Sequence, residues 1–170
     1  MNIIIEGVDN AGKSSLIEHL MPYLIGSVVH RGFDADAQSV LAKQVDELSP
    51  TGNTCYDRSA VISGYIYDLV LGRTPVVKFN LDSVAEVCEN TIVILCKPPL
   101  ANCLATDKDE MPGVVDNHTK LFDAYGEVFY AMKNTYEVPF FTYDYTRNKP
   151  DDVVEYIISR LTSHNKELEA

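Results

Sequence analysis

Apolar residues recur along the chain in two patterns, short continuous runs and stripes with helical spacing. The runs at 3–5 and 92–96 consist of adjacent Ile, Val, Leu and Cys residues. Such runs are typical of strands buried on both faces of a parallel sheet. Weaker runs at 27–30, 53–57 and 138–143 predict the other strands of the same sheet.

Stripes with a period near 3.6 residues separate these runs and predict helices. The clearest consist of Leu16, Ile17, Leu20, Met21 and Leu24, which end at Gly26, and of Leu121, Ala124, Tyr125, Val128, Phe129 and Met132. We also expect helices over 35–48, 59–71 and 100–105 and from Pro150 onward, and interpret 76–90 as a loop with one short helix. Strands that alternate with helices predict a three-layer α/β fold, with a five-stranded parallel sheet covered on both faces. No break in composition divides the chain, so we expect one domain over 1–170.

The first apolar run leads directly into Gly7-x-x-x-x-Gly12-Lys13-Ser14, and a helical stripe follows. Strand, glycine loop and helix form the structural context of a phosphate-binding P-loop. The glycines allow backbone angles that turn successive N–H groups toward an anion, and the helix directs the positive end of its dipole to the same point. Lys13 can reach the β- and γ-phosphates of a nucleotide, and the Ser14 hydroxyl can bind Mg²⁺.

Composition and charge narrow the possible partners. The formal charge of −11 argues against nonspecific binding to nucleic acid, although a local basic cleft could still hold anions. No segment approaches the ~20 apolar residues of a membrane span, and the N-terminus does not resemble a signal peptide, so we expect a cytoplasmic protein. The four cysteines lack Cys-x-x-Cys spacing and are interpreted as buried thiols.

Chemically active residues follow the predicted strands. Ligands of parallel α/β sheets bind beyond the carboxyl ends of the strands. The residues that map to those ends are Gly7, Arg31, Asp57, Lys97 and Thr146. This convergence predicts a single site at one edge of the sheet.

With these residues, the chain resembles P-loop nucleotide kinases of the thymidylate kinase-like group, most closely the small deoxynucleotide kinases often encoded by phages. Three segments carry the resemblance: Ile-Glu-Gly-Val-Asp-Asn-Ala-Gly-Lys-Ser-Ser from Ile5, Asp-Arg-Ser-Ala-Val-Ile-Ser-Gly-Tyr-Ile-Tyr from Asp57, and Leu-Cys-Lys-Pro-Pro-Leu from Leu95. The resemblance implies Mg²⁺-dependent transfer of the ATP γ-phosphate to a deoxynucleoside monophosphate. Relatives often form dimers, so a homodimer is also expected.

The resemblance implies a role for each matching residue. Lys13, Asp57 and Arg58 would be catalytic, and Ser14 and Asp57 would lie at the metal. ATP would be bound by Asp9, Asn10, Ala11, Gly12, Lys13, Ser14, Ser15 and Arg147. The acceptor would be bound by Asp9, Arg31, Arg58, Ser63, Tyr67 and Arg73, with the planar guanidinium of Arg58 suited to bidentate capture of its phosphate.

The family pattern fails where cationic charge is needed at the transition state. Relatives supply an arginine from the P-loop or from a lid over the nucleotide. Here the P-loop interior is Val8-Asp9-Asn10-Ala11, and the lid-like loop expected at 106–117 offers only Lys108. Lys97 and Arg147 are the other candidates for this charge. The Glu-Pro pair that relatives often carry after the second strand is also missing.

Three alternatives stay open on the sequence alone. A deoxynucleoside kinase would use Asp57 as the general base for a 5′-hydroxyl, which must lose a proton as a monophosphate need not. A regulatory GTPase is suggested by Asn148-Lys149-Pro150-Asp151, although no Asp-x-x-Gly ends the third strand. A nucleotide-binding module with weak or no catalysis would explain the lid without arginine.

Overall fold

The structure is a computed structural model that describes the chain except for residues 25, 27, 31–36, 50, 73, 75, 76, 105–112, 169 and 170. Its centre is a parallel sheet with strand order β2-β3-β1-β4-β5. The strands are β1 (Ile3–Glu6), β2 (Val28–His30), β3 (Cys55–Asp57), β4 (Ile92–Cys96) and β5 (Phe141–Tyr143). The parallel α/β architecture predicted from the sequence is therefore confirmed.

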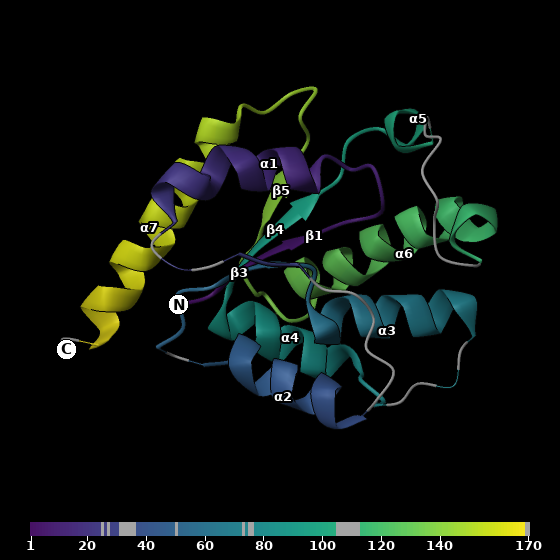
Figure 1. The fold of residues 1–170 in the computed structure, drawn as a ribbon, viewed down its shortest axis with the longest axis horizontal. Helices are drawn as coiled ribbons and strands as arrows, with labels where there is room; N and C mark the ends of the chain where they lie inside the picture. Colours follow the sequence, from purple (N-terminus) through teal and green to yellow (C-terminus); the bar gives the residue numbers. More distant parts are fainter. Residues whose placement is uncertain are drawn as a thin grey trace.

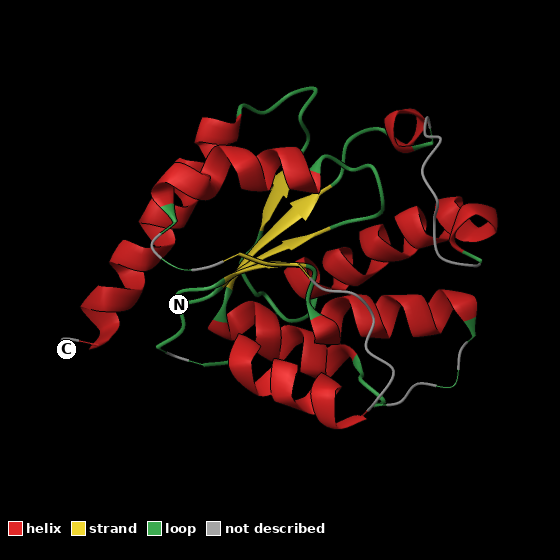
Figure 2. Cartoon of the chain, viewed as in Figure 1, coloured by secondary structure: helices red, strands yellow, loops and turns green. Residues whose placement is uncertain are grey.

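Helices cover both faces of this sheet (Figure 1 and Figure 2). They are α1 (Lys13–Leu20), the short 3₁₀ helix η1 (Met21–Tyr23), α2 (Ala37–Glu47), α3 (Ala60–Leu71), α4 (Leu81–Asn90), α5 (Leu100–Cys103), α6 (Val114–Asn134) and α7 (Pro150–Leu168). One face carries α1 and α7, and the other carries α3, α4 and α6, with α2 packed against α3. No helix in the described part of the chain has the length and apolar character that a membrane crossing requires.

The two apolar runs form the middle of the core. Every residue of β1 and β4 is buried, as continuous apolar runs predict. β1 pairs with β3 on one side and with β4 on the other. Because the P-loop follows β1 directly, it begins at the carboxyl end of the central strand of the sheet.

Several predicted boundaries were wrong. The lid-like loop expected at 106–117 ends earlier, because Gly113 takes a left-handed conformation (φ 85) that starts α6 at Val114. The predicted fifth strand at 138–143 is only β5, because the Val138 N–H instead closes the end of α6 by bonding the Met132 carbonyl. The helix that we expected to run to Gly26 ends as α1 at Leu20, and Pro22, which has no N–H, lies in η1.

The segment interpreted as loop and short helix contains a well-capped helix, α4. The Asn80 side chain accepts a hydrogen bond from the Ser83 N–H at 2.9 Å, and the two residues form a capping box. The expected helix 35–48 is α2, and residues 35 and 36 lie outside the described residues. At the start of α3, Ser59 caps the helix and Gly72 ends it.

Candidate active site

The P-loop has the backbone that its glycines predict. Gly7 (φ 137), Asn10 (φ 61) and Gly12 (φ 86) all have positive φ, and α1 starts at Lys13. A Cβ at Gly7 would lie 2.3 Å from the Cys96 carbonyl oxygen, so β4 approaches too closely for any other residue. This conformation turns backbone N–H groups inward beside the positive end of α1, which is how a loop binds phosphate.

Lys13 lies folded onto this loop. Its Nζ donates to the carbonyl oxygens of Gly7 at 3.0 Å and Val8 at 2.7 Å, and the side chain is buried. Burial, and after it the nearby charge of Arg58, lower the pKa of Lys13 to about 8, against the opposing effect of Asp9 and Asp57. The ammonium therefore lies where an incoming phosphate would stabilise its charge.

Arg58 reaches the same carbonyl from the other side. Its Nη1 donates to the Gly7 carbonyl at 2.9 Å, and its Nη2 donates to the Asp9 carboxylate at 2.5 Å. Burial alone would lower the pKa of Arg58, but its neighbours Tyr125, Tyr67 and Asp9 more than offset this, so the pKa lies above its ordinary value. The P-loop and the segment after β3 thus meet through two cations on one carbonyl group.

Asp9 and Tyr67 complete this group of expected residues. The Tyr67 hydroxyl donates to Asp9 at 3.3 Å, and the Arg58 guanidinium carbon lies 5.4 Å from the centre of the Tyr67 ring. Such a distance is typical of a cation–π contact. The structure therefore brings together Asp9, Lys13, Arg58 and Tyr67, which come from three separate elements.

Glu6 is a buried polar residue that sequence reasoning missed. It ends β1 with no exposed surface, and its carboxylate accepts hydrogen bonds from two backbone N–H groups and two hydroxyl groups. The hydroxyl groups belong to Ser63 and Tyr125. Burial raises the pKa of Glu6, while the charge of Arg58 and the Ser59 N–H act in the opposite direction.

A second buried carboxylate, that of Glu47, lies at the start of α3. Its Oε2 accepts from the Ser59 hydroxyl at 2.7 Å, and its Oε1 accepts from the Ala60 N–H at 2.8 Å. The Ser59 hydroxyl oxygen in turn accepts from the N–H groups of Val61 and Ile62. Glu47 therefore fixes the residues that directly follow Arg58, although the sequence placed it only inside a predicted helix.

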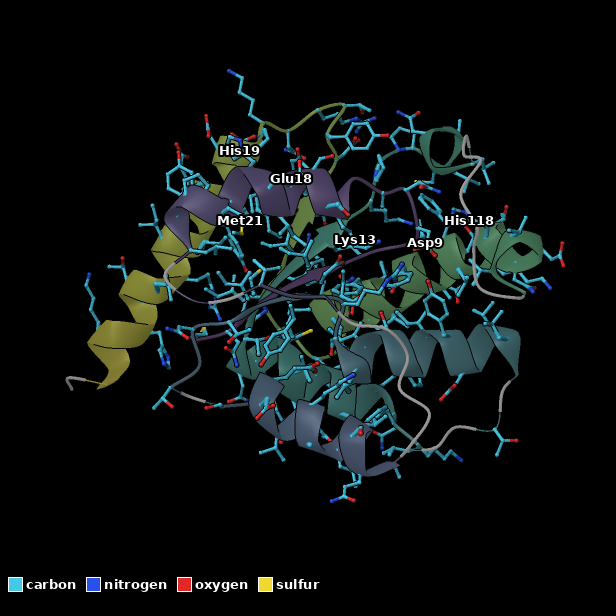
Figure 3. All side chains as sticks on the ribbon, viewed as in Figure 1. Asp9, Lys13, Glu18, His19, Met21 and His118 are labelled. Atoms are coloured by element: carbon cyan, nitrogen blue, oxygen red, sulfur yellow. The ribbon has the colours of Figure 1, made fainter. Side chains whose placement is uncertain are left out.

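Helix α6 contacts the site through two side chains, those of Tyr125 and His118. Tyr125 belongs to the apolar stripe that predicted this helix and is buried, yet its hydroxyl contacts Glu6, Ser63 and Arg58. The Nε2 of His118, one turn into α6, lies 3.3 Å from the Asp9 carbonyl oxygen (Figure 3). Because a carbonyl oxygen can only accept, the proton on His118 is on Nε2 in this arrangement.

Other expected residues lie at the edge of this site or beyond the described chain. Arg31, Arg73 and Lys108 fall outside the described residues. Lys97 turns to α6, where Nζ donates to the Phe122 carbonyl at 3.0 Å and borders a hollow of about 410 Å³ lined also by Asp123, Gly126, Glu127 and Tyr130. Arg147 is exposed and pairs with Asp144 at 3.5 Å.

The turn that carries Arg147 nevertheless approaches the P-loop. A Cβ added at Gly12 would come within 2.9 Å of the Tyr145 ring, so this aromatic side chain lies against the loop. Thr146, expected at the carboxyl end of the fifth strand, donates to the Asp144 carboxylate. The turn after β5 thus borders the phosphate-binding loop.

In the motif that suggested a GTPase, Asn148 and Asp151 make contacts with neighbouring parts of the protein. The side-chain oxygen of Asn148 accepts from the Asp144 N–H at 3.0 Å, and the Asp151 carboxylate lies 3.0 Å from Nε2 of His19 on α1. Both groups hold the turn and the start of α7 in place. This arrangement gives no support to a guanine-reading role for Asn148-Lys149-Pro150-Asp151.

Ser14 and Asp57 are the two residues that the sequence analysis assigned to a magnesium ion. Ser14 is exposed at the start of α1, and Asp57 ends β3 close enough to affect the pKa of Lys13. Among the described residues, no cluster of three or more His, Cys, Asp or Glu side chains could hold a metal by itself. This donor set fits Mg²⁺, which keeps several waters and takes its remaining ligands from nucleotide phosphates.

Comparisons with known proteins point to one fold. No protein-family model and no curated sequence matches the chain. Among solved structures, it is similar to YorR from Bacillus subtilis, solved in complex with phosphorylated GDP, at 15% identity over 98% of both chains with a TM-score of 0.62. It is also similar to deoxyadenosine kinase from M. mycoides with bound dATP, at 19% identity over 95% of this chain and 100% of that chain with a TM-score of 0.56. The chain therefore shares the fold of these two solved structures.

Proposed function

We propose that the protein is a nucleoside monophosphate kinase that transfers the γ-phosphoryl group of ATP, with Mg²⁺, to the phosphate of a deoxynucleoside monophosphate. In this proposal Lys13 and the loop from Asp9 to Ser15 hold the donor phosphates. Ser14 and Asp57 hold the metal ion, whose charge offsets that of the phosphates. The cytoplasm is the expected compartment, and a homodimer is the expected assembly.

One observation carries the proposal: a buried arginine meets the P-loop from outside it. The Nη1 group of Arg58 donates to the Gly7 carbonyl and to the Tyr125 hydroxyl, and its Nη2 group donates to the Asp9 carboxylate. Within the described part of the chain, these contacts leave its Nε–H and the second N–H of Nη2 for a ligand. The Nε and Nη2 nitrogens lie along one edge of the guanidinium, and such an edge suits bidentate capture of a phosphate.

The arrangement is also consistent with direct transfer of a phosphoryl group from the donor phosphates to the acceptor phosphate. Donor phosphates on Lys13 and an acceptor phosphate on Arg58 would lie on either side of the Gly7 carbonyl. Holding two reactants close together and aligned accounts for much of the catalysis in phosphoryl transfer. Tyr145, in the same turn as Arg147, lies against the P-loop, and we propose Arg147 and Lys108 as sources of the additional positive charge.

A deoxynucleoside kinase is the second candidate. Two observations favour it: solved deoxyadenosine kinases share the fold, and Asp57 lies beside the P-loop, where a general base for a 5′-hydroxyl would be needed. The monophosphate is preferred because a neutral hydroxyl would leave the free edge of Arg58 without an anion.

A panel of deoxynucleosides and their 5′-monophosphates, each incubated with ATP and Mg²⁺, tests the proposal by the release of ADP. We expect turnover with at least one monophosphate and none in the Lys13→Ala variant. Arg58→Ala should raise the KM of the acceptor by roughly 10- to 100-fold, as loss of hydrogen bonds to a charged group predicts, and should change the KM of ATP much less.

Turnover with nucleosides but not with monophosphates would replace the first candidate by the second. If neither class of acceptor releases ADP while ATP still binds, the protein is a nucleotide-binding module. An equal rise of both KM values in Arg58→Ala would remove the assignment of Arg58 to the acceptor.

A further inference from the structure

The Glu6 carboxylate is surrounded by donors from three elements. Its Oε1 accepts from the Ser59 N–H at 2.6 Å, and its Oε2 accepts from the Tyr125 hydroxyl at 2.8 Å and from the Gly7 N–H at 3.3 Å. The Ser63 hydroxyl lies 3.1 Å from both oxygens. Each oxygen therefore faces a backbone N–H, which cannot reverse its direction, so both positions require an atom that can accept and neither can hold an NH₂ group.

The direction of the hydrogen bonds from Arg58 to Glu6 follows from this. Because the Tyr125 hydroxyl donates its proton to Glu6, its oxygen is left to accept from Nη1 of Arg58 at 3.2 Å. The result is a cation, a hydroxyl and a carboxylate in series, an order in which each bond polarises the next. The buried hydroxyl thus connects Arg58 to the anion that lies below the P-loop.

Arg58 also needs support from its surroundings, because its backbone is in the left-handed region at φ 74. That region is unfavourable for a non-glycine residue, and such residues persist only where neighbouring contacts hold them. The Arg58 N–H bonds the Ile5 carbonyl at 3.0 Å, and Glu6 binds the next N–H along the chain. Glu6 therefore holds the peptide group that follows Arg58, and it is connected to the Arg58 side chain through Tyr125.

We propose that Glu6 and Tyr125 are positioning residues that hold the Arg58 guanidinium so that its free edge faces the acceptor phosphate. The proposal deepens the proposed function and rests on it. Neither residue touches a substrate in this role. Tyr125 fixes Nη1, the Gly7 carbonyl fixes the same nitrogen from the P-loop, and the Nε–Nη2 edge is left for the ligand.

Tyr125→Phe tests the side-chain connection with the loss of one oxygen atom. Removing a hydrogen bond to a charged group should raise the KM of the acceptor by about tenfold, with kcat and the KM of ATP changed less than about twofold. Tyr136→Phe is the matched control, because it removes a hydroxyl that donates to Asp82 on the surface, and it should leave both KM values unchanged.

Glu6→Gln tests whether both oxygen acceptors of Glu6 are needed. Either orientation of the new amide places its NH₂, which can only donate, against a backbone N–H. We expect a larger rise in the acceptor KM than in Tyr125→Phe, and Glu6→Asp should not rescue it because the shorter side chain cannot reach the same donors. If Glu6→Gln does not fold, Tyr125→Phe and Ser63→Ala still test the network.

A measurement without substrate separates this inference from the proposed function. In the folded wild type, a held guanidinium should give resolved ¹⁵N–¹H signals for the two Nη groups of Arg58, assigned by their loss in Arg58→Lys. These signals should average in Tyr125→Phe and remain resolved in Tyr136→Phe.

The possible results distinguish the positioning role from the proposed kinase activity. Unchanged Arg58 signals in Tyr125→Phe, or an equal rise of both KM values, would overturn the positioning role. A wild type that phosphorylates no acceptor but loses its resolved Arg58 signals in Tyr125→Phe would reject the proposed kinase activity and leave the anchoring of Arg58 by Tyr125 in place.

Discussion

Two segments at the carboxyl edge of the sheet are built in opposite ways. Around the P-loop, buried polar groups from β1, α2, α3 and α6 bind one another across long stretches of sequence, as in the bond between Tyr125 and Glu6, 119 residues apart. In the turn after β5, polar groups at the surface or partly buried bind partners within four residues, as Asp144 does with Thr146, Arg147 and Asn148. The contacts around the P-loop therefore form only when the whole chain is folded, whereas the contacts in the turn after β5 depend mainly on neighbouring residues.

The comparison predicts that a carboxylate in the buried region contributes far more stability than one on the surface. Glu47→Ala removes the acceptor of the Ser59 hydroxyl and the Ala60 N–H, both within the protein. Leaving such groups without partners should lower the free energy of unfolding by about 2–4 kcal/mol, measured by urea denaturation. The control is Asp82→Ala, which removes an exposed carboxylate that accepts from Tyr136 and should cost less than about 1 kcal/mol. Equal losses in the two variants would mean that burial does not set the difference.

The buried region should also make ATP binding depend on pH. With a pKa of about 8, Lys13 is half neutral at pH 8 in the free protein, and bound phosphates favour its ammonium form. Binding should therefore take up about half a proton at pH 8, and affinity should fall toward tenfold per pH unit above that value while staying level below it. Calorimetry in two buffers of different ionisation enthalpy measures the uptake.

Lys13→Arg is the control for this pH dependence, because a guanidinium keeps its charge throughout the range. The variant should bind ATP with no proton uptake at pH 8. Heats of binding that are identical in both buffers for the wild type would show that Lys13 is already fully charged before ATP arrives.

The smallest effect is expected in the exposed turn. Arg147→Ala removes a charge from the turn whose Tyr145 borders the P-loop, but the Arg147 side chain is largely in water, so the KM of ATP should rise only about threefold and stability should change by less than about 0.5 kcal/mol. Lys149→Ala, which removes a neighbouring exposed charge, should leave the KM of ATP unchanged. A rise beyond tenfold in Arg147→Ala would mean that the turn is as important to the nucleotide as the buried region is.

The sequence predicted what depends on local pattern. Apolar runs located β1 and β4, and the glycine spacing located the loop between β1 and α1, because both signals lie within a few residues. It also predicted that Arg58 would reach the P-loop, since parallel strands end at a common edge.

The buried carboxylates could not be recognised in the same way. Glu6 did give a signal, since an acid at the end of an apolar run must find donors, but its partners Ser59, Ser63 and Tyr125 are set by packing between helices. Glu47 gave no signal at all, because an acid near the end of a helix is usually exposed. Contacts that depend on three-dimensional packing have no fixed spacing in sequence.

The strand order has a consequence for how nucleotide preference could change over evolution. β1 is held by a neighbour on each side, while β2 and β5 each have one. A change of length or angle in a central strand would disturb two ladders at once, whereas a change in an outer strand disturbs one. New selectivity for a base or sugar would therefore arise most easily in the segments that follow β2 and β5, with the phosphate machinery at the centre inherited unaltered.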